Sequence, residues 1–254
     1  MKIIGVVPAR MAASRFPGKP LHPILGRTLL EHVFERARKF TRWDALVVAT
    51  CDEEIRAYAE SKNYPVLMTS DTHTRALDRV TEATEKLDMD VDENDIVINV
   101  QGDEPMLRPD MIEAVVKPFS EGPDVDGTML AMPIVDEELY RNPDILKIAH
   151  TLKGDVLYTS RNPIPWCKEF SPELEAKRIG GIFAFRWHFL KTFTALPESP
   201  LEIKEACDSN RLYDYGYTQR IALVPPQPFY SVDSPADAEK VAKALEADPL
   251  WGTY

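Results

Sequence analysis

The segment Lys2-Ile3-Ile4-Gly5-Val6-Val7, followed at once by Pro8-Ala9-Arg10, sets the fold class of this chain. It is an apolar run of strand length, and similar runs recur at 45–50, 65–69, 95–100 and 128–134. Helical patterns lie between these runs, for example at 29–37 and 78–87. Buried strands that alternate with helices are typical of βα units. The sequence therefore predicts an α/β fold with a mostly parallel sheet and helices on both of its faces.

The pattern changes after residue 140. Strand-like runs at 146–150 and 155–160 flank a Lys153-Gly154 turn and predict a hairpin. A strand at 181–186, helical patterns at 187–195 and 201–215 and a last strand at 220–224 follow. Because no linker or repeat sets this part apart, we expect one domain over 1–254, with residues 140–218 as an α+β insertion. Ser234-Pro235, followed by Asp237, predicts the start of a final helix.

Composition narrows the class of function. The chain has 254 residues, with 30 Lys and Arg against 41 Asp and Glu, which gives a net charge of −11. Such a charge disfavours binding to nucleic acid or to an anionic membrane. The three scattered cysteines, Cys51, Cys167 and Cys207, predict reduced thiols and a cytoplasmic setting. No leader-like segment and no apolar run of about 18 residues is present, so we expect no membrane insertion.

Three cations follow the first strand within ten residues: Arg10, Arg15 and Lys19. Ligands of open α/β sheets bind beyond the carboxyl ends of the strands, and a triphosphate needs backbone N–H donors and cationic side chains. The loop has no Gly-x-Gly-x-x-Gly motif, and Pro20 stands where a P-loop has Ser or Thr. The pattern indicates a phosphate loop of another kind. By composition alone, a solvated basic loop is an equal alternative.

Two acidic residues are candidate metal ligands. Asp103 follows the apolar run 95–100 beside Gly102, and Asp233 precedes the final helix. Carboxylates at strand ends suit a Mg²⁺ ion that also binds phosphate oxygens. Taken singly, an aspartate in such a place is more often structural, so that Asp103 would form a turn and Asp233 would be a turn or near-cap residue.

The string Val7-Pro8-Ala9-Arg10-x-x-x-Ser14-Arg15-x-Pro17-Gly18-Lys19-Pro20-Leu21 resembles the opening signature of the sugar-acid cytidylyltransferases. Within them the likeness is greatest to the 3-deoxy-manno-octulosonate (KDO) cytidylyltransferase, or CMP-KDO synthetase, family. It continues in family order through Val100-Gln101-Gly102-Asp103-Glu104-Pro105, Tyr158-x-Ser160-Arg161-x-Pro163-Ile164-Pro165 and Val232-Asp233-Ser234-Pro235-x-Asp237. These blocks span nearly the whole chain.

The resemblance implies a nucleotide-diphospho-sugar transferase-like fold and an enzyme that transfers CMP from CTP to the anomeric hydroxyl of a 2-keto-3-deoxy sugar acid, releasing pyrophosphate. It implies Mg²⁺ on Asp103 and Asp233, with Arg10, Arg15, Lys19 and Asp103 as catalytic residues. It also implies a homodimer that acts in lipopolysaccharide biosynthesis, with the 140–218 insertion contributing to the sugar site and the dimer. The nucleotide-binding residues that it implies are Pro8, Ala9, Arg10, Ser14, Arg15, Lys19, Met68, Thr69, Asp78, Arg79 and Gln101.

The chain departs from the family pattern in two places. On the nucleotide side, Arg75-Ala76-Leu77 replaces Ser-Gly-Thr, and on the sugar side Ile179, Phe183, Asp208 and Ser209 replace family residues. The sugar-binding residues that we expect are Gln101, Arg161, Glu205, Asp208 and Ser209.

Two physical arguments support these sugar-binding residues. The guanidinium of Arg161 suits a bidentate grip on a carboxylate, and a helix over 201–215 would put Glu205, Asp208 and Ser209 on one face. A solvated acidic face is the alternative for that helix. Because unmatched polar groups discriminate strongly between ligands, the changed positions predict an acceptor related to KDO but not necessarily KDO itself.

Two other functions stay open from the sequence. One is a nucleotidyltransferase that acts on a sugar 1-phosphate with another nucleoside triphosphate. The other is a non-catalytic nucleotide-binding module, which the presence of both Asp103 and Asp233 disfavours.

Overall fold

A computed structural model describes residues 1–12, 15–122 and 124–254. The chain forms two compact units. Unit 1 comprises Met1–Glu113 and Pro228–Tyr254, and unit 2 comprises Ala114–Gln227. The predicted insertion at 140–218 lies inside unit 2, and the boundary between the units falls within α4 (Pro109–Val116).

The sheet of unit 1 is parallel, with the strand order β6-β1-β4-β5. Val6 in the middle of β1 pairs with Val47 on one side and Asn99 on the other. Most of its strand residues are buried, which explains why they read as continuous apolar runs. The strands are β1 (Ile3–Pro8), β4 (Ala45–Thr50), β5 (Val66–Met68) and β6 (Ile96–Val100).

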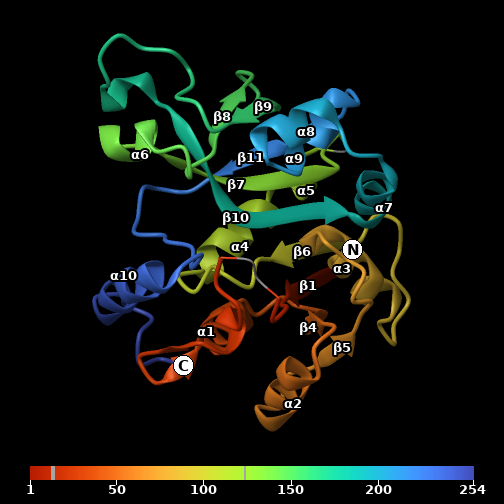
Figure 1. Cartoon of the computed structure of the whole chain (residues 1–254). Helices are drawn as coiled ribbons and strands as arrows, with labels where there is room; N and C mark the ends of the chain where they lie inside the picture. The colour runs from red at the N-terminus through yellow and green to blue at the C-terminus, as the bar shows by residue number, and fades with distance from the viewer. Residues whose placement is uncertain (13–14, 123) are drawn as a thin grey trace. The chain divides into compact units, whose positions relative to one another are not determined.

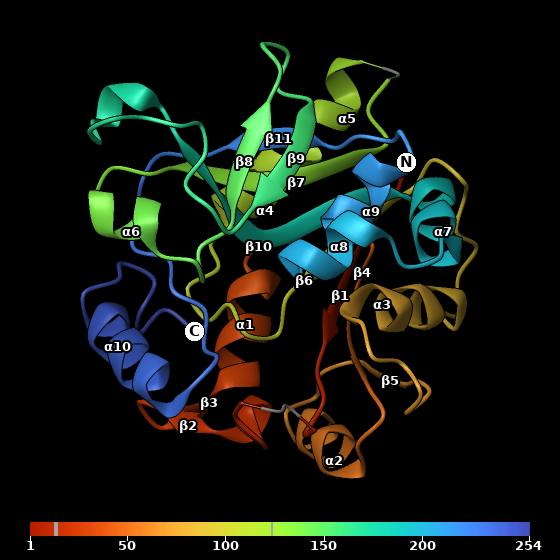
Figure 2. The same cartoon turned by 45° about the horizontal axis from the view of Figure 1, so that its top comes forward.

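Helices flank this parallel sheet. α3 contacts β1, β4 and β6, α2 contacts β4 and β5, and α1 lies on the opposite side of β1 from α3 (Figures 1 and 2). α10 begins as predicted, because the Ser234 side chain accepts a hydrogen bond from the Asp237 N–H. The remaining elements of unit 1 are η1 (Lys19–Leu21), β2 (Pro23–Ile24), β3 (Arg27–Thr28), α1 (Leu29–Arg38), α2 (Glu53–Ser61), α3 (Ala76–Glu85) and α10 (Pro235–Glu246).

Unit 2 contains a mixed arrangement of strands. β7 (Gly127–Pro133) pairs parallel with β11 (Arg220–Leu223) and antiparallel with β10 (Lys177–Arg186). β8 (Lys147–His150) and β9 (Val156–Ser160) form the predicted hairpin. β10 starts at Lys177, four residues before the predicted strand at 181–186, and its register shifts between Ile179 and Phe183. That shift interrupts the alternation by which a strand is recognised in a sequence.

The predicted helix at 201–215 is wrong, because two short helices stand in its place. α8 (Pro200–Glu205) ends at Ala206, whose φ of 47° is left-handed, and α9 (Ser209–Asp214) starts three residues later. Glu205, Asp208 and Ser209 therefore do not share one helical face. The other helices of this unit are α5 (Pro118–Glu121), α6 (Glu137–Arg141), η2 (Pro172–Leu174) and α7 (Trp187–Ala195).

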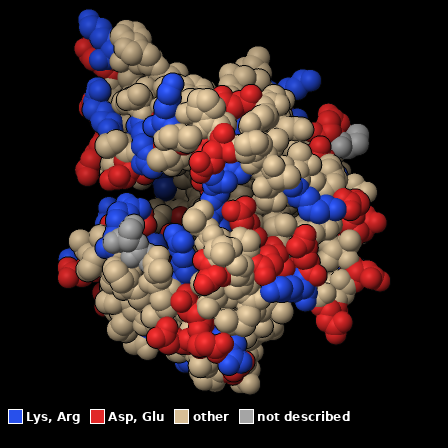
Figure 3. Space-filling model, turned by 45° about the vertical axis from the view of Figure 1, so that its right-hand side comes forward, with Lys and Arg blue, Asp and Glu red and all other residues tan. Residues whose placement is uncertain are grey.

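The predicted α/β class is confirmed, with the parallel sheet in unit 1. Among the described residues, no helix combines the length and the apolar character needed to cross a membrane. Acidic and basic side chains are interspersed over the face of the molecule in Figure 3.

Candidate functional site

The candidate site lies in unit 1, where β1 and β6 end side by side. The two strands are parallel neighbours, so the segments after Pro8 and after Val100 leave the sheet at the same edge. Gly102 permits their close approach, because a Cβ atom at this position would lie 2.5 Å from the Pro8 carbonyl oxygen. Any larger residue would push Asp103 away from the loop that follows β1.

That loop, residues 9–20, is named here the cation loop, and hydrogen bonds fix it at several points. The Ala9 N–H donates to the Ala49 carbonyl at 2.9 Å, and the Met11 N–H donates to the Asp52 carboxylate at 2.8 Å. The Met11 carbonyl in turn accepts from the Gly18 N–H at 2.9 Å. Gly18 has a φ of 75°, which glycine adopts without strain, and the chain then enters η1. The predicted nucleotide ligand Ser14 lies outside the described residues.

Lys19 is the centre of the site. Its Nζ donates to Asp103 Oδ2 at 3.0 Å, to Asp233 Oδ1 at 3.2 Å and to the Val232 carbonyl at 2.9 Å. Arg15 binds the other oxygen of Asp233, with Nη2 3.0 Å from Oδ2. The structure thus brings together two predicted cations and both predicted metal ligands, from segments more than 200 residues apart along the chain.

Electrostatics keep Lys19 charged. Burial alone would lower the pKa of its ammonium group, but the charges and hydrogen bonds of Asp103 and Asp233 outweigh burial and raise that pKa above its ordinary value. The Lys19 side chain is 16% exposed, so water screens this ion-pair cluster less than it would screen a surface pair.

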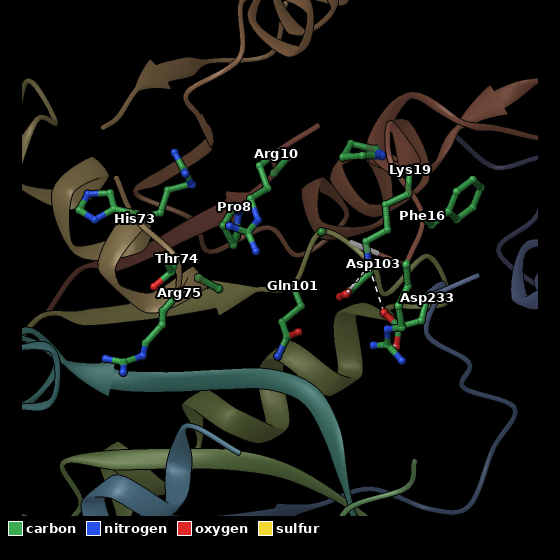
Figure 4. A pocket seen from close by; sticks show the side chains of 16 residues that line it. Pro8, Arg10, Phe16, Lys19, His73, Thr74, Arg75, Gln101, Asp103 and Asp233 are labelled. Atoms are coloured by element: carbon green, nitrogen blue, oxygen red, sulfur yellow. Dashed lines mark hydrogen bonds and ion pairs between the residues drawn. The ribbon is translucent and has the colours of Figure 1, made fainter. Parts of the chain in front are cut away.

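The cluster forms one wall of a cavity of about 270 Å³. In Figure 4, Lys19, Asp103 and Asp233 lie at one side of the cavity, His73, Thr74 and Arg75 at the other, and Pro8, Arg10 and Gln101 between them. The lining residues are Pro8, Ala9, Arg10, Arg15, Phe16, Lys19, Pro20, His73, Thr74, Arg75, Ala76, Arg79, Gln101, Gly102, Asp103 and Asp233.

Three predicted nucleotide ligands are not among these lining residues: Met68, Thr69 and Asp78. The Thr69 hydroxyl instead accepts a hydrogen bond from the buried guanidinium of Arg79, and the Met68 carbonyl accepts one from Lys86 at 2.9 Å. Asp78 lies in the first turn of α3. Thr69 therefore supports the lining residue Arg79, and Met68 binds Lys86, which is not a lining residue.

Glu82 stabilises the part of the cavity wall that contains His73. This carboxylate accepts from the Ser70 N–H at 2.8 Å, pairs with His73 Nε2 at 2.5 Å and binds the Lys86 ammonium at 2.6 Å. Burial raises the pKa of Glu82, but these hydrogen bonds outweigh that effect and lower the pKa to about 2. Arg75 and Ala76, which replace the family's Ser-Gly, line the cavity beside this wall.

The predicted sugar ligands other than Gln101 lie in unit 2. The Glu205 carboxylate accepts one hydrogen bond from the Ser160 hydroxyl at 2.8 Å and another from the backbone N–H of Arg161 at 2.9 Å. The Arg161 guanidinium donates to the carbonyls of Pro143, Glu205 and Ala206. We name Ser160, Arg161 and Glu205, with these carbonyls, the polar junction. Ser209 is buried and Asp208 half-buried at the start of α9.

Several of these residues were not singled out from the sequence as functional. Phe16, His73 and Thr74 line the cavity, and Asp52 holds the cation loop. Asp52 follows β4 as Asp103 follows β6, so its position after a strand is the signal that could have pointed to it. Val232 contributes its backbone carbonyl, and a contact of this kind cannot be predicted from the residue type.

The chain is similar to known proteins over most of its length. A family model described as cytidylyltransferase matches residues 4–221. A 3-deoxy-manno-octulosonate cytidylyltransferase from Syntrophotalea carbinolica is 38% identical, over 96% of this chain and 99% of its own. Another, from Syntrophobacter fumaroxidans, is 38% identical over 98% and 99%. A solved CMP:2-keto-3-deoxy-manno-octonic acid synthetase complexed with CTP is 33% identical, covers 97% of this chain and 99% of its own, and superposes with a TM-score of 0.87.

Proposed function

Since the chain belongs to the cytidylyltransferase family, we propose that it transfers CMP from CTP to the anomeric hydroxyl of KDO or of a closely related 2-keto-3-deoxy sugar acid and releases pyrophosphate. Family membership confirms the resemblance predicted from the sequence, and it makes the protein a nucleotidyltransferase. One observation carries the choice of site: a single ammonium group, that of Lys19, contacts both Asp103 and Asp233 at the wall of a cavity.

The residues fit a magnesium ion. Three oxygens, from Asp103, Asp233 and the Val232 carbonyl, already surround one cationic group within 3.2 Å. These are hard oxygen donors, which Mg²⁺ prefers, and Mg²⁺ commonly takes one or two carboxylates and completes its shell with phosphate oxygens and water. No third acidic residue, histidine or cysteine joins the two aspartates to form a metal-binding group in the described ranges. We propose Asp103 and Asp233 as the metal ligands.

When bound there, Mg²⁺ supplies Lewis-acid polarisation of the α-phosphoryl group and lowers the pKa of the attacking hydroxyl. Asp103 and Asp233 orient the substrates around that position. Arg10, Arg15 and Lys19 neutralise the charge that develops on the leaving pyrophosphate, as cationic clamps do in other phosphoryl transfers. The reaction needs no covalent intermediate on the protein, since alignment and charge neutralisation suffice.

The remaining roles are proposals of the same kind. Pro8, Ala9, Gln101 and Arg79 line the cavity and are proposed to bind the nucleotide, and Gln101 also the sugar. Met68, Thr69, Ser14 and Asp78 are proposed to complete the nucleotide site, Thr69 through its hydrogen bond with Arg79.

On the sugar side, Arg161 is the proposed carboxylate ligand. Each of its terminal nitrogens donates one hydrogen bond to a backbone carbonyl in the polar junction, which leaves each a second N–H for a ligand. Glu205, Asp208 and Ser209 are proposed to contact the hydroxyl groups of the sugar. The changed positions, Phe183 among them, favour an acceptor that differs from KDO in its polar substituents.

A pyrophosphate-release assay tests this function. The four nucleoside triphosphates are each combined with KDO, other 2-keto-3-deoxy sugar acids and sugar 1-phosphates. We expect release only with CTP and a sugar acid. Release with a sugar 1-phosphate and another triphosphate would establish the alternative transferase, and tight CTP binding without release from any pair would indicate a non-catalytic module.

We further propose a homodimer in the cytoplasm that acts in lipopolysaccharide biosynthesis. The three free cysteines are consistent with a reducing compartment. Light scattering at several protein concentrations tests the dimer, and loss of lipopolysaccharide on gene deletion tests the pathway.

A further inference from the structure

We propose that Lys19 is an internal counter-ion, which occupies the cation position between Asp103 and Asp233 in the free enzyme and yields it only when a triphosphate draws the ammonium group away. The free enzyme then binds a divalent cation weakly, and the metal enters together with the nucleotide. This inference rests on the proposed function, since it takes the two aspartates as the metal ligands.

The first observation is that the hydrogen bonds of Lys19 are fully used. An ammonium group has three N–H donors. Those of Lys19 meet Asp103 Oδ2, Asp233 Oδ1 and the Val232 carbonyl, at 2.9 to 3.2 Å. Lys19 therefore cannot bind a phosphate oxygen without giving up at least one of these three partners.

The second observation is that the cluster is electrically balanced. Asp103 and Asp233 carry two negative charges, and Lys19 and Arg15, which contact them directly, carry two positive charges. A divalent cation entering this cluster would meet two cations at close range, and at the low exposure of Lys19 their repulsion is only partly screened. The two carboxylates are thus neutralised until a competing anion arrives.

A triphosphate supplies that anion. It carries more negative charge than the two carboxylates together, and Arg10, Arg15 and Lys19 line the cavity that it would fill. Transfer of the Lys19 ammonium to phosphate oxygens replaces its two charge-assisted hydrogen bonds to the aspartates by others of the same kind. The same movement frees Asp103 Oδ2 and Asp233 Oδ1 for the metal, whose remaining ligands are phosphate oxygens and water. Lys19 thereby restricts metal binding to the nucleotide-bound state, in which the metal can take part in the reaction.

The test measures Mn²⁺ binding to the nucleotide-free protein by electron paramagnetic resonance, with Mn²⁺ as the spectroscopic probe for Mg²⁺. Lys19→Met removes the ammonium group but keeps the length of the side chain. We expect the variant to bind Mn²⁺ about tenfold more tightly than the wild type, a coupling of the usual size between neighbouring sites.

Arg10→Met is the matched control. Arg10 is an exposed cation that lines the same cavity, so its removal changes the total charge of the site by the same amount. Because water screens an exposed charge, we expect a gain in Mn²⁺ affinity of less than about threefold. In the double variant Lys19→Met/Asp103→Asn, the tighter Mn²⁺ binding should be lost. That loss would assign the Mn²⁺ ion to the site between the two aspartates.

The inference is overturned if Lys19→Met binds Mn²⁺ no more tightly than the wild type or than Arg10→Met, or binds none at all. Thermal unfolding shows whether each variant is folded, and Lys19→Gln replaces Lys19→Met should the latter unfold. The proposed function fails separately: in that case the wild-type enzyme releases no pyrophosphate from CTP with any sugar acid, whatever the Mn²⁺ measurements show.

Discussion

Similar charged residues have different roles in the cation loop of unit 1 and in the polar junction of unit 2. In the first, Lys19 and Arg15 meet carboxylates, and these side chains line a cavity. In the second, Arg161 meets three backbone carbonyls, and Glu205 ties the end of β9 to the end of α8. Charges that pair with one another at a cavity can be exchanged for those of a ligand. Charges that satisfy backbone groups hold the chain in place.

This contrast predicts that substitutions at the cation loop reduce activity more than stability, whereas substitutions of the buried residues behind the polar junction, such as Asn210, reduce stability more than activity. Four changes test it, and they are given in order of decreasing effect.

Asp103→Asn should have the largest effect. It keeps the size of the side chain but removes the charge that binds Lys19, and we expect kcat to fall by about 10²–10³-fold, the usual range for losing one charge-stabilising group. Pyrophosphate release measures the loss, and the melting temperature should stay within a few degrees of the wild type. A nearly active variant would remove Asp103 from the chemistry.

Asn210→Ala should affect stability instead. The fully buried Asn210 side chain accepts from the Thr159 N–H at 3.0 Å and donates to the Thr159 carbonyl at 3.0 Å. Its removal leaves two buried backbone groups without these partners, and we expect a loss of about 2–3 kcal/mol in the free energy of unfolding. Urea denaturation measures this loss. An unchanged midpoint would mean that α9 is held by other contacts.

Asp52→Ala should lower kcat/KM for CTP by about tenfold, because the loop that carries the cations loses its hydrogen bond from Met11 and is less well oriented. Asp52→Asn keeps an acceptor oxygen and should restore most of the activity. Equal loss in the two variants would show that the negative charge of Asp52 matters, and not its hydrogen bond.

Glu82→Gln should have the smallest effect. The folded-state pKa of Glu82 is about 2, below the ordinary value of 4.5, so the stabilisation from its charge is fully present above pH 4.5. It is lost as the pH falls toward 2. Since water screens this partly exposed group, we expect a difference of only about 0.5 kcal/mol from the wild type at pH 7. Melting temperatures against pH should converge below pH 4.5, and a constant gap would contradict the role given to the charge.

Much of unit 1 could be predicted from the sequence, because its signals are local. The apolar run before Pro8 is a strand buried on both faces, and Ser234-Pro235 forms the helix start that its residue types favour. The cation loop and Asp103 meet because parallel neighbouring strands end at one edge of a sheet. That rule needs no knowledge of side-chain packing.

Unit 2 was predicted less well, for a physical reason. The helical pattern at 201–215 is broken at Ala206 by long-range contacts, since Asn210 bonds to Thr159 and Cys207 is buried. Such tertiary contacts override local propensity and leave no local signal. For the same reason the sequence did not reveal that the Arg161 guanidinium is bound by backbone carbonyls.

A crystal structure of the enzyme with CTP and Mn²⁺, with the metal located by its anomalous signal, tests the central claim most directly. The account predicts a manganese peak bound by Asp103 and Asp233, with the Lys19 ammonium moved onto a phosphate oxygen. A metal bound away from both aspartates, or a Lys19 that still bridges them beside the bound nucleotide, would contradict it.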